Sequence, residues 1–107
     1  QRAQGNTMAD PIIVNVTKDL EALIPRFLAN RQKDIATITH ALDTKDFDVI
    51  RIVGHSIKGV GGSYGFDTIT QFGTELEDAA VHSDVPKLRD TLSRYQDYLG
   101  RVKVNIK

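Results

Sequence analysis

Cysteine and tryptophan are absent from this chain of 107 residues, methionine occurs once and proline three times. Without cysteine there can be no disulfide, no thiolate ligand for a metal and no cysteine nucleophile. The 14 Lys and Arg residues balance 14 Asp and Glu residues, so no basic surplus exists to bind nucleic acid or an anionic membrane. No apolar run exceeds the three residues of Ile12 to Val14, whereas a membrane span needs roughly 18. We therefore expect neither a nucleic acid partner nor a membrane partner.

The proportions of residue types are those of one globular domain. Hydrophobic residues make up 40% of the chain and charged residues 26%, which suits a packed core and not a disordered chain. The sequence does not open with the basic and apolar segments of a secretory signal. We interpret residues 1–7 as a remnant of recombinant expression before Met8, residues 1–10 as a disordered N-terminus and residues 11–107 as a single domain. Since the lack of cysteine fits a reducing compartment, we expect the protein to be cytoplasmic.

Apolar residues at helical spacing predict a long first helix between Leu20 and Leu42. Pro25 lies inside this range and has no N–H for the helical ladder, so the helix either begins there or is kinked there. A second helix is predicted from about Asp46, a suitable N-cap, to Gly62. The positions that carry the two patterns are Leu20, Ile24, Phe27, Leu28, Ile35, Ile38 and Leu42, then Phe47, Ile50, Val53, Ile57 and Val60.

Two further helices complete the pattern. The third has Asp67 as a suitable cap and ends near His82, and the fourth has Asp84 as its cap and Pro86 in its first turn, where proline is tolerated. Their apolar positions are Phe66, Ile69, Phe72, Leu76 and Ala80, then Val85, Leu88, Leu92, Tyr95, Leu99 and Val102. Four amphipathic helices with no convincing alternating strand predict an all-α fold, an antiparallel four-helix bundle with a short N-terminal extension. The extension, residues 11–16, is either an extended arm or a short helical turn, and the sequence leaves that choice open.

His55 is predicted to face solvent in the middle of the second helix. At about 100° per residue, the apolar stripe of this helix centres at about 340° when Ile50 is set at zero, and His55 falls at about 140°. Arg51, Lys58 and Gly62 lie within about 60° of the histidine on the same wheel. A lone exposed histidine usually has no special role, so position alone does not single it out.

Two glycines in the same helix point to a function for this face. Each glycine inside a helix costs up to about 1 kcal/mol relative to alanine, so Gly54 and Gly59 need a compensating role. Gly54 lies towards the core edge, where it permits close helix packing. Gly59 points outward one turn after His55, which suits the close approach of a macromolecule. Imidazole is nucleophilic near neutral pH and can carry a labile phosphoryl group, with whose negative charge Lys58 can pair.

The residues from His55 to Gly65 resemble the signature of histidine-containing phosphotransfer (HPt) domains: His, any two residues, Lys-Gly, any five residues, Gly. His55, Lys58, Gly59 and Gly65 occupy its fixed positions without a gap. The similarity to small stand-alone bacterial members covers about residues 12–104. It includes the segments Leu23-Ile24-Pro25-Arg26-Phe27-Leu28, Asp46-Phe47, Gly54-His55, Ser63-Tyr64-Gly65-Phe66 and Leu76-Glu77.

This resemblance implies a phosphocarrier in a multistep phosphorelay of two-component signalling. His55 would accept a phosphoryl group from a receiver-domain aspartyl phosphate or from a histidine kinase and pass it to a receiver aspartate, while Lys58 supports the phosphoryl group. The chain would act as a monomer. It would have no cofactor, no metal site and no autonomous catalytic activity, because the receiver supplies Mg²⁺ and most of the catalytic groups. The expected docking residues surround the histidine on the exposed face: Arg51, Ile52, Gly59 and Gly62.

Other kinds of site fit the residues less well. The segment from Gly54 imitates the start of a P-loop but lacks its Lys-Ser/Thr, and the segment from Gly59 lacks the third glycine and the preceding strand of a dinucleotide fingerprint. The three histidines have no carboxylates at ligand spacing, which argues against a metal site. We interpret His40 and His82 as surface residues and the aromatic residues as core. We interpret the three acidic residues Glu75, Glu77 and Asp78 as a solvated helix face.

Two alternatives belong to other classes of protein. A phosphoacceptor segment of a histidine kinase would show an acidic residue directly after the histidine and a nearby proline, whereas Ser56 and Ile57 follow here and no ATP-binding domain is present. A helical adaptor that binds receiver domains without being phosphorylated stays open. The presence of both His55 and Lys58 disfavours the adaptor, and a phosphorylation assay separates the two functions.

Overall fold

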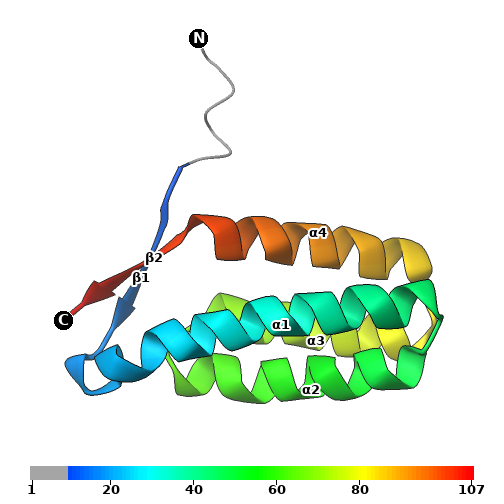
Figure 1. Ribbon diagram of the computed structural model, residues 1–107, viewed down its shortest axis with the longest axis horizontal. Coiled ribbons are helices and arrows are strands. Elements are labelled where there is room, and N and C mark those ends of the chain that lie inside the picture. The colour runs from blue at the N-terminus through cyan, green and yellow to red at the C-terminus, as the bar shows by residue number, and fades with distance from the viewer. Residues whose placement is uncertain (1–9) are drawn as a thin grey trace, which may run out of the picture.

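A computed structural model describes residues 10–107, so our interpretation of residues 1–9 lies outside the described residues. Figure 1 shows four α-helices packed side by side, with the α1–α2 and α3–α4 turns at one end and the α2–α3 turn at the other. The predicted helical bundle is confirmed. In chain order, the elements are β1 (Ile12–Val16), the 3₁₀ helix η2 (Lys18–Leu23), α1 (Ile24–Asp43), α2 (Phe47–Ser63), α3 (Asp67–Val81), α4 (Val85–Arg101) and β2 (Val102–Ile106).

Pro25 determines where the first long helix begins. It lies in the first turn of α1, which starts at Ile24, so the proline starts the helix and does not kink it. Of the two possibilities that the sequence left open, a helix that begins at the proline is confirmed, and Leu20 lies before it in the 3₁₀ helix η2. A continuous α-helix would press the proline ring against the carbonyl of the residue four positions earlier, and the tighter 3₁₀ turn replaces it.

Side-chain caps begin two of the helices as predicted. The Asp46 carboxylate accepts a hydrogen bond from the Val49 N–H at 3.3 Å, and Asp84 caps α4 in the same way. The expectation that Asp67 caps α3 is wrong, since Asp67 is the first residue inside that helix and Phe66 occupies the cap position. In the first turn, the Asp67 charge still interacts favourably with the positive end of the helix dipole.

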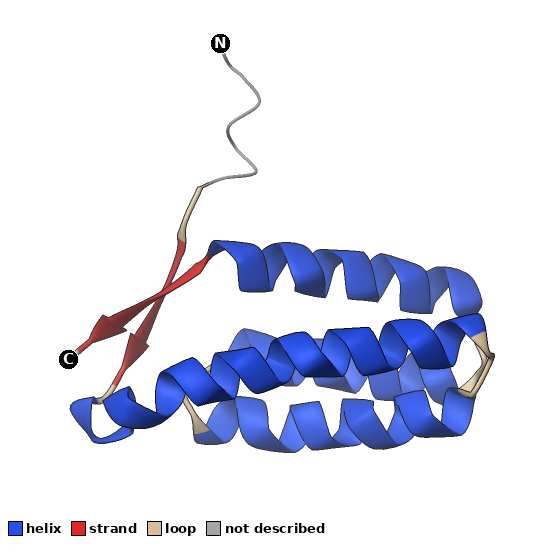
Figure 2. Cartoon of the chain, in the orientation of Figure 1, coloured by secondary structure: helices blue, strands red, loops and turns tan. Residues whose placement is uncertain are grey.

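A two-stranded parallel sheet joins the two ends of the described chain (Figure 2). Ile12 pairs with Val102, and the register continues to Val16 opposite Ile106. The sequence left the conformation of residues 11–16 open, and Ile12–Val16 of this segment form a strand. The assignment of Val102 to the fourth helix is wrong: its spacing continues the helical pattern, but the β-branched residues that follow favour an extended chain when a partner strand is available.

The bundle core is formed by side chains from all four helices and from β1. The largest side chains that are fully enclosed are Tyr95, Phe66, Ile38, Ile50, Ile57, Ile69, Leu76 and Leu88. This packing fixes α2 with Ile50 and Ile57 inward, and its opposite face is therefore turned to solvent. Within residues 10–107, no helix is both long and apolar enough to cross a membrane.

Candidate functional site

His55 lies in the middle of α2 and its side chain is 67% exposed. This exposure agrees with the helical wheel. Ile50 and Ile57, which the wheel places on the other side of the helix, are fully buried. His40 and His82 are also on the surface, as predicted. Among the described residues, no group of three or more His, Asp or Glu side chains is arranged to hold a metal ion.

Glu77 on α3 contacts both predicted site residues of α2. Its Oε2 lies 3.0 Å from His55 Nδ1, and its Oε1 accepts a hydrogen bond from Lys58 Nζ at 3.2 Å. The interpretation of Glu77 as part of a solvated helix face is therefore wrong. The same correction applies to Glu75, whose carboxylate accepts a hydrogen bond from Arg94 of α4 at 2.6 Å.

The carboxylate of Glu77 determines which nitrogen of His55 is free. Partial burial opposes its ionisation, but the hydrogen bonds from Lys58 and His55 outweigh this, so the pKa of Glu77 lies below its ordinary value of 4.5. An ionised carboxylate can only accept hydrogen bonds, so Nδ1 of His55 must be the donor. In the neutral ring, the lone pair then resides on Nε2. The site thus presents a nucleophilic nitrogen on an exposed ring whose other nitrogen is held in place.

Two glycines allow α2 and α3 to approach closely enough for this contact. A Cβ added to Gly54 would lie 2.8 Å from the backbone nitrogen of Glu77, and one added to Gly73 would collide with the backbone of Lys58. We call His55, Lys58 and Glu77 the histidine cluster. Each of the two glycines therefore faces the backbone of a residue in the histidine cluster. Glu77 lies one helical turn after Gly73, on the part of α3 that Gly54 and Gly73 allow to approach α2.

The surface next to His55 is open. A Cβ added to Gly59 would meet no atom within 4 Å, in agreement with the outward position predicted for it. Ile52 is 53% exposed, which is high for a large apolar side chain. Arg51 pairs with Asp48 at 2.8 Å, and the Gly62 N–H donates to Thr70 Oγ1 at 2.8 Å. The predicted docking residues thus lie on the exposed side of α2, and two of them also have local partners.

Gly65, the last glycine of the motif, has a backbone role. Its φ of +85° lies in the left-handed region of the backbone, which residues other than glycine rarely adopt. This conformation forms the turn between α2 and α3, where the Gly65 N–H bonds the Gly62 carbonyl at 3.1 Å. The motif therefore combines residues of the exposed face with one residue that the turn requires.

Comparison with protein families places this arrangement in a known group. The model of the Hpt domain family matches residues 22–104, and the chain belongs to this family. Hpt domains are phosphocarriers, so the chain has a phosphotransfer role in two-component signalling. Searches of curated proteins and of solved structures returned no significant match.

Proposed function

We propose that His55 is the phosphoacceptor of a multistep phosphorelay and that Nε2 is the reacting atom. The donor is the aspartyl phosphate of a receiver domain or a histidine kinase, and the acceptor is a receiver aspartate. The lone pair of Nε2 forms the new N–P bond while the bond between phosphorus and the donor atom breaks, a P–O bond for an aspartyl phosphate and a P–N bond for a phosphohistidine of a kinase, and the electron pair of the broken bond stays on the donor atom. The observation that carries this proposal is the exposed ring of His55 with Nδ1 bound to Glu77.

Glu77 acts as a positioning residue in this proposal. Attack by Nε2 leaves a positive charge on the ring, and the carboxylate already bound to Nδ1–H stabilises it. The same hydrogen bond restrains rotation of the ring and keeps Nε2 directed away from α3. Because phosphoryl transfer depends mainly on positioning and charge stabilisation, a rigid bundle that holds one imidazole is a sufficient contribution from this chain.

Lys58 supplies positive charge beside the reacting nitrogen. One of its N–H groups is used on Glu77, and its side chain is 43% exposed, so further donors can reach a phosphoryl group on the ring. Gly59 and Ile52 provide an open and partly apolar surface next to the histidine, on which a receiver domain docks, with Arg51 and Gly62 at its margin. Mg²⁺ and most of the catalytic groups come from the receiver in this proposal.

The test is phosphorylation by purified receiver domains. The chain is incubated with a panel of phosphorylated receivers, and acid-labile, base-stable phosphate on it is measured. We expect such phosphate on the wild type and none on His55→Gln, whose stability should stay within about 0.5 kcal/mol because the site is exposed. Labelling of the variant at the wild-type level would place the phosphoacceptor elsewhere. Receiver binding without any phosphate would instead support the adaptor function. A cytoplasmic location and a monomeric state remain predictions from the sequence.

A further inference from the structure

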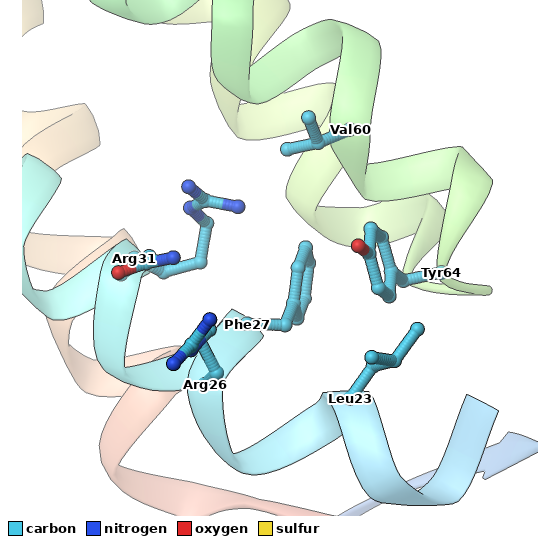
Figure 3. Close-up of a pocket in the computed structure, with 7 residues that line it drawn as sticks. Leu23, Arg26, Phe27, Arg31, Val60 and Tyr64 are labelled. Atoms are coloured by element: carbon cyan, nitrogen blue, oxygen red, sulfur yellow. The ribbon is translucent and has the colours of Figure 1, made fainter.

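A second feature of α2 lies outside the histidine cluster. A cavity of about 170 Å³ opens between the beginning of α1 and the end of α2 (Figure 3). It is lined by apolar and aromatic side chains together with two guanidinium groups and an amide. The lining residues are Leu23, Arg26, Phe27, Asn30, Arg31, Val60 and Tyr64.

The aromatic rings form a rigid wall of this cavity. The rings of Phe27 and Tyr64 stack with their centroids 4.4 Å apart, and the guanidinium of Arg31 lies 4.9 Å from the centre of the Phe27 ring. The Arg31 residue is 9% exposed, so its position is fixed by packing. Phe27, Tyr64 and Arg31 thus have defined positions in the cavity wall, whereas Leu23 and Arg26 lie at its exposed edge.

The cavity carries uncompensated positive charge. Asp34 accepts a hydrogen bond from Arg31 Nε at 2.8 Å, which offsets one of the two guanidinium charges. In the part of the chain that the structure describes, no ion pair uses Arg26. The net charge around the cavity is thus positive, although the net charge of the whole chain is zero.

Size and chemistry together indicate what the cavity holds. Ligand sites for cofactor-sized molecules have volumes of about 300 to 1,000 Å³, whereas a cavity of about 150 Å³ accommodates a molecule as small as benzene. The cavity is therefore suited to a single side chain. Guanidinium groups match carboxylates in geometry and charge, and the apolar wall suits the methylene stem of an acidic residue.

The position of the cavity connects it with the proposed docking surface. Val60 directly follows Gly59 in α2; at about 1.5 Å and 100° per residue it lies about 7.5 Å along the helix and about 140° around it from His55, on the side of α2 that faces α1. A standard protein interface covers about 800 Å² on each partner, which corresponds to a radius of about 16 Å. A receiver domain centred on His55 reaches the cavity only where its contact area extends around α2 onto the beginning of α1.

We propose that this cavity binds an Asp or Glu side chain of the docked receiver domain and that Arg26 selects receivers with an acidic residue at that place. This inference rests on the proposed function of His55, because it takes the receiver as the partner. Charged groups at the margin of an interface affect association rate and specificity most strongly. The expected role of Arg26 is therefore in partner choice and not in the chemistry at Nε2.

The experiment measures receiver binding and phosphoryl transfer separately. Dissociation constants for the receiver panel are determined without phosphorylation for the wild type, Arg26→Gln, Arg26→Glu and the control Arg89→Glu. Arg89 is exposed on α4 and lines a different cavity, between α1 and α4. For a receiver that binds the wild type, we expect Arg26→Glu to weaken binding by about tenfold or more, Arg26→Gln by less, and Arg89→Glu by under about twofold. Replacing the contacting acid of that receiver by Lys should restore binding to Arg26→Glu.

The outcomes distinguish this inference from the function on which it rests. Equal binding by the wild type and Arg26→Glu overturns the inference, even if His55 is phosphorylated normally. Weakened binding with no phosphate on His55 supports the cavity contact and contradicts the phosphoacceptor function. If no receiver binds the wild type, both proposals are wrong. Sodium propionate is the probe for a small free carboxylate. If propionate binds saturably at the cavity while Arg26→Glu leaves receiver binding unchanged, the occupant of the cavity is a small carboxylate and not the receiver.

Discussion

His55 and Glu77 depend on each other at the level of single residues. The imidazole alone would rotate freely at an exposed position, and either nitrogen could carry the proton. The carboxylate on the neighbouring helix selects the Nδ1–H form and leaves Nε2 to react. An exposed histidine thus gains a defined orientation from a residue 22 positions later in the chain.

Replacement of Glu77 by Gln should slow phosphorylation of His55 by about tenfold, the lower end of the effect of removing the hydrogen-bond partner of a metal-binding histidine. The amide keeps the size of the side chain but removes the charge that stabilises the imidazolium. The measurement is the rate of phosphate incorporation from a fixed receiver. Wild-type rates in Glu77→Gln would contradict the positioning role.

The same variant should change how stability depends on pH. Because the pKa of Glu77 is lowered in the folded chain, folding favours its ionised form. This stabilisation is fully present above the ordinary pKa of 4.5 and is lost as the pH falls through the lower pKa of the folded state. Urea unfolding should show the wild type losing more stability than Glu77→Gln as the pH drops below 4.5. Parallel curves for the two proteins would contradict the ionised contact.

At the level of the elements, Gly54 and Gly59 of α2 have opposite environments. Gly54 faces the backbone of α3, whereas the space outside Gly59 is empty within 4 Å. The same substitution by alanine should therefore have opposite effects at two positions of one helix. The pair provides a matched test of helix packing against partner docking.

Gly54→Ala should destabilise the fold by about 1 to 3 kcal/mol, because its Cβ would force α2 and α3 apart. The contact between His55 and Glu77 should weaken with it. Thermal unfolding gives the stability, and the ¹⁵N chemical shifts of the His55 ring report the hydrogen bond at Nδ1. Unchanged stability would mean that the helices separate without cost.

Gly59→Ala should keep or raise stability, by up to about 1 kcal/mol, through its higher helix propensity. Transfer from a receiver should nevertheless weaken, and weaken further in Gly59→Gln, because the longer side chain obstructs docking. Melting temperature and receiver-dependent phosphorylation are measured on the same variants. A parallel loss of both would show that Gly59 serves packing and not docking.

At the scale of the whole molecule, the parallel strands β1 and β2 pair with each other at one end of the bundle and so connect the two ends of the described chain. Val102, Val104 and Ile106 are half-buried on the inner face of β2, while Lys103 on the other face is exposed. The histidine cluster involves only α2 and α3. Stability and site chemistry should therefore respond differently to changes in the strands.

A chain that ends at Arg101 should lose about 3 kcal/mol of stability, or about 1 kcal/mol for each of the three half-buried side chains removed. The ¹⁵N shifts of the His55 ring in the folded fraction should stay as in the full chain. Lys103→Ala is the control and should change stability by less than about 0.5 kcal/mol. If the shortened chain is as stable as the full chain, the strands do not contribute to the fold.

The sequence by itself determined the helices, two of their caps and the exposed position of His55. These features depend on interactions within a few residues: the apolar period of a helix identifies its inner face, and Asp46 and Asp84 cap residues three positions away. The motif around Lys58 and Gly59 is likewise contained in one helix, so it can be read without knowledge of the neighbours.

Only the tertiary structure decided the strand pair and the partner of His55. Val102 continues a helical spacing, and its extended conformation follows from pairing with Ile12, a residue 90 positions away. Glu77 looks like any solvated acid until α3 is placed against α2, and the distance between these helices is set by Gly54 and Gly73. Both features arise from hydrogen bonds between distant segments, and helical periodicity carries no information about which segments meet.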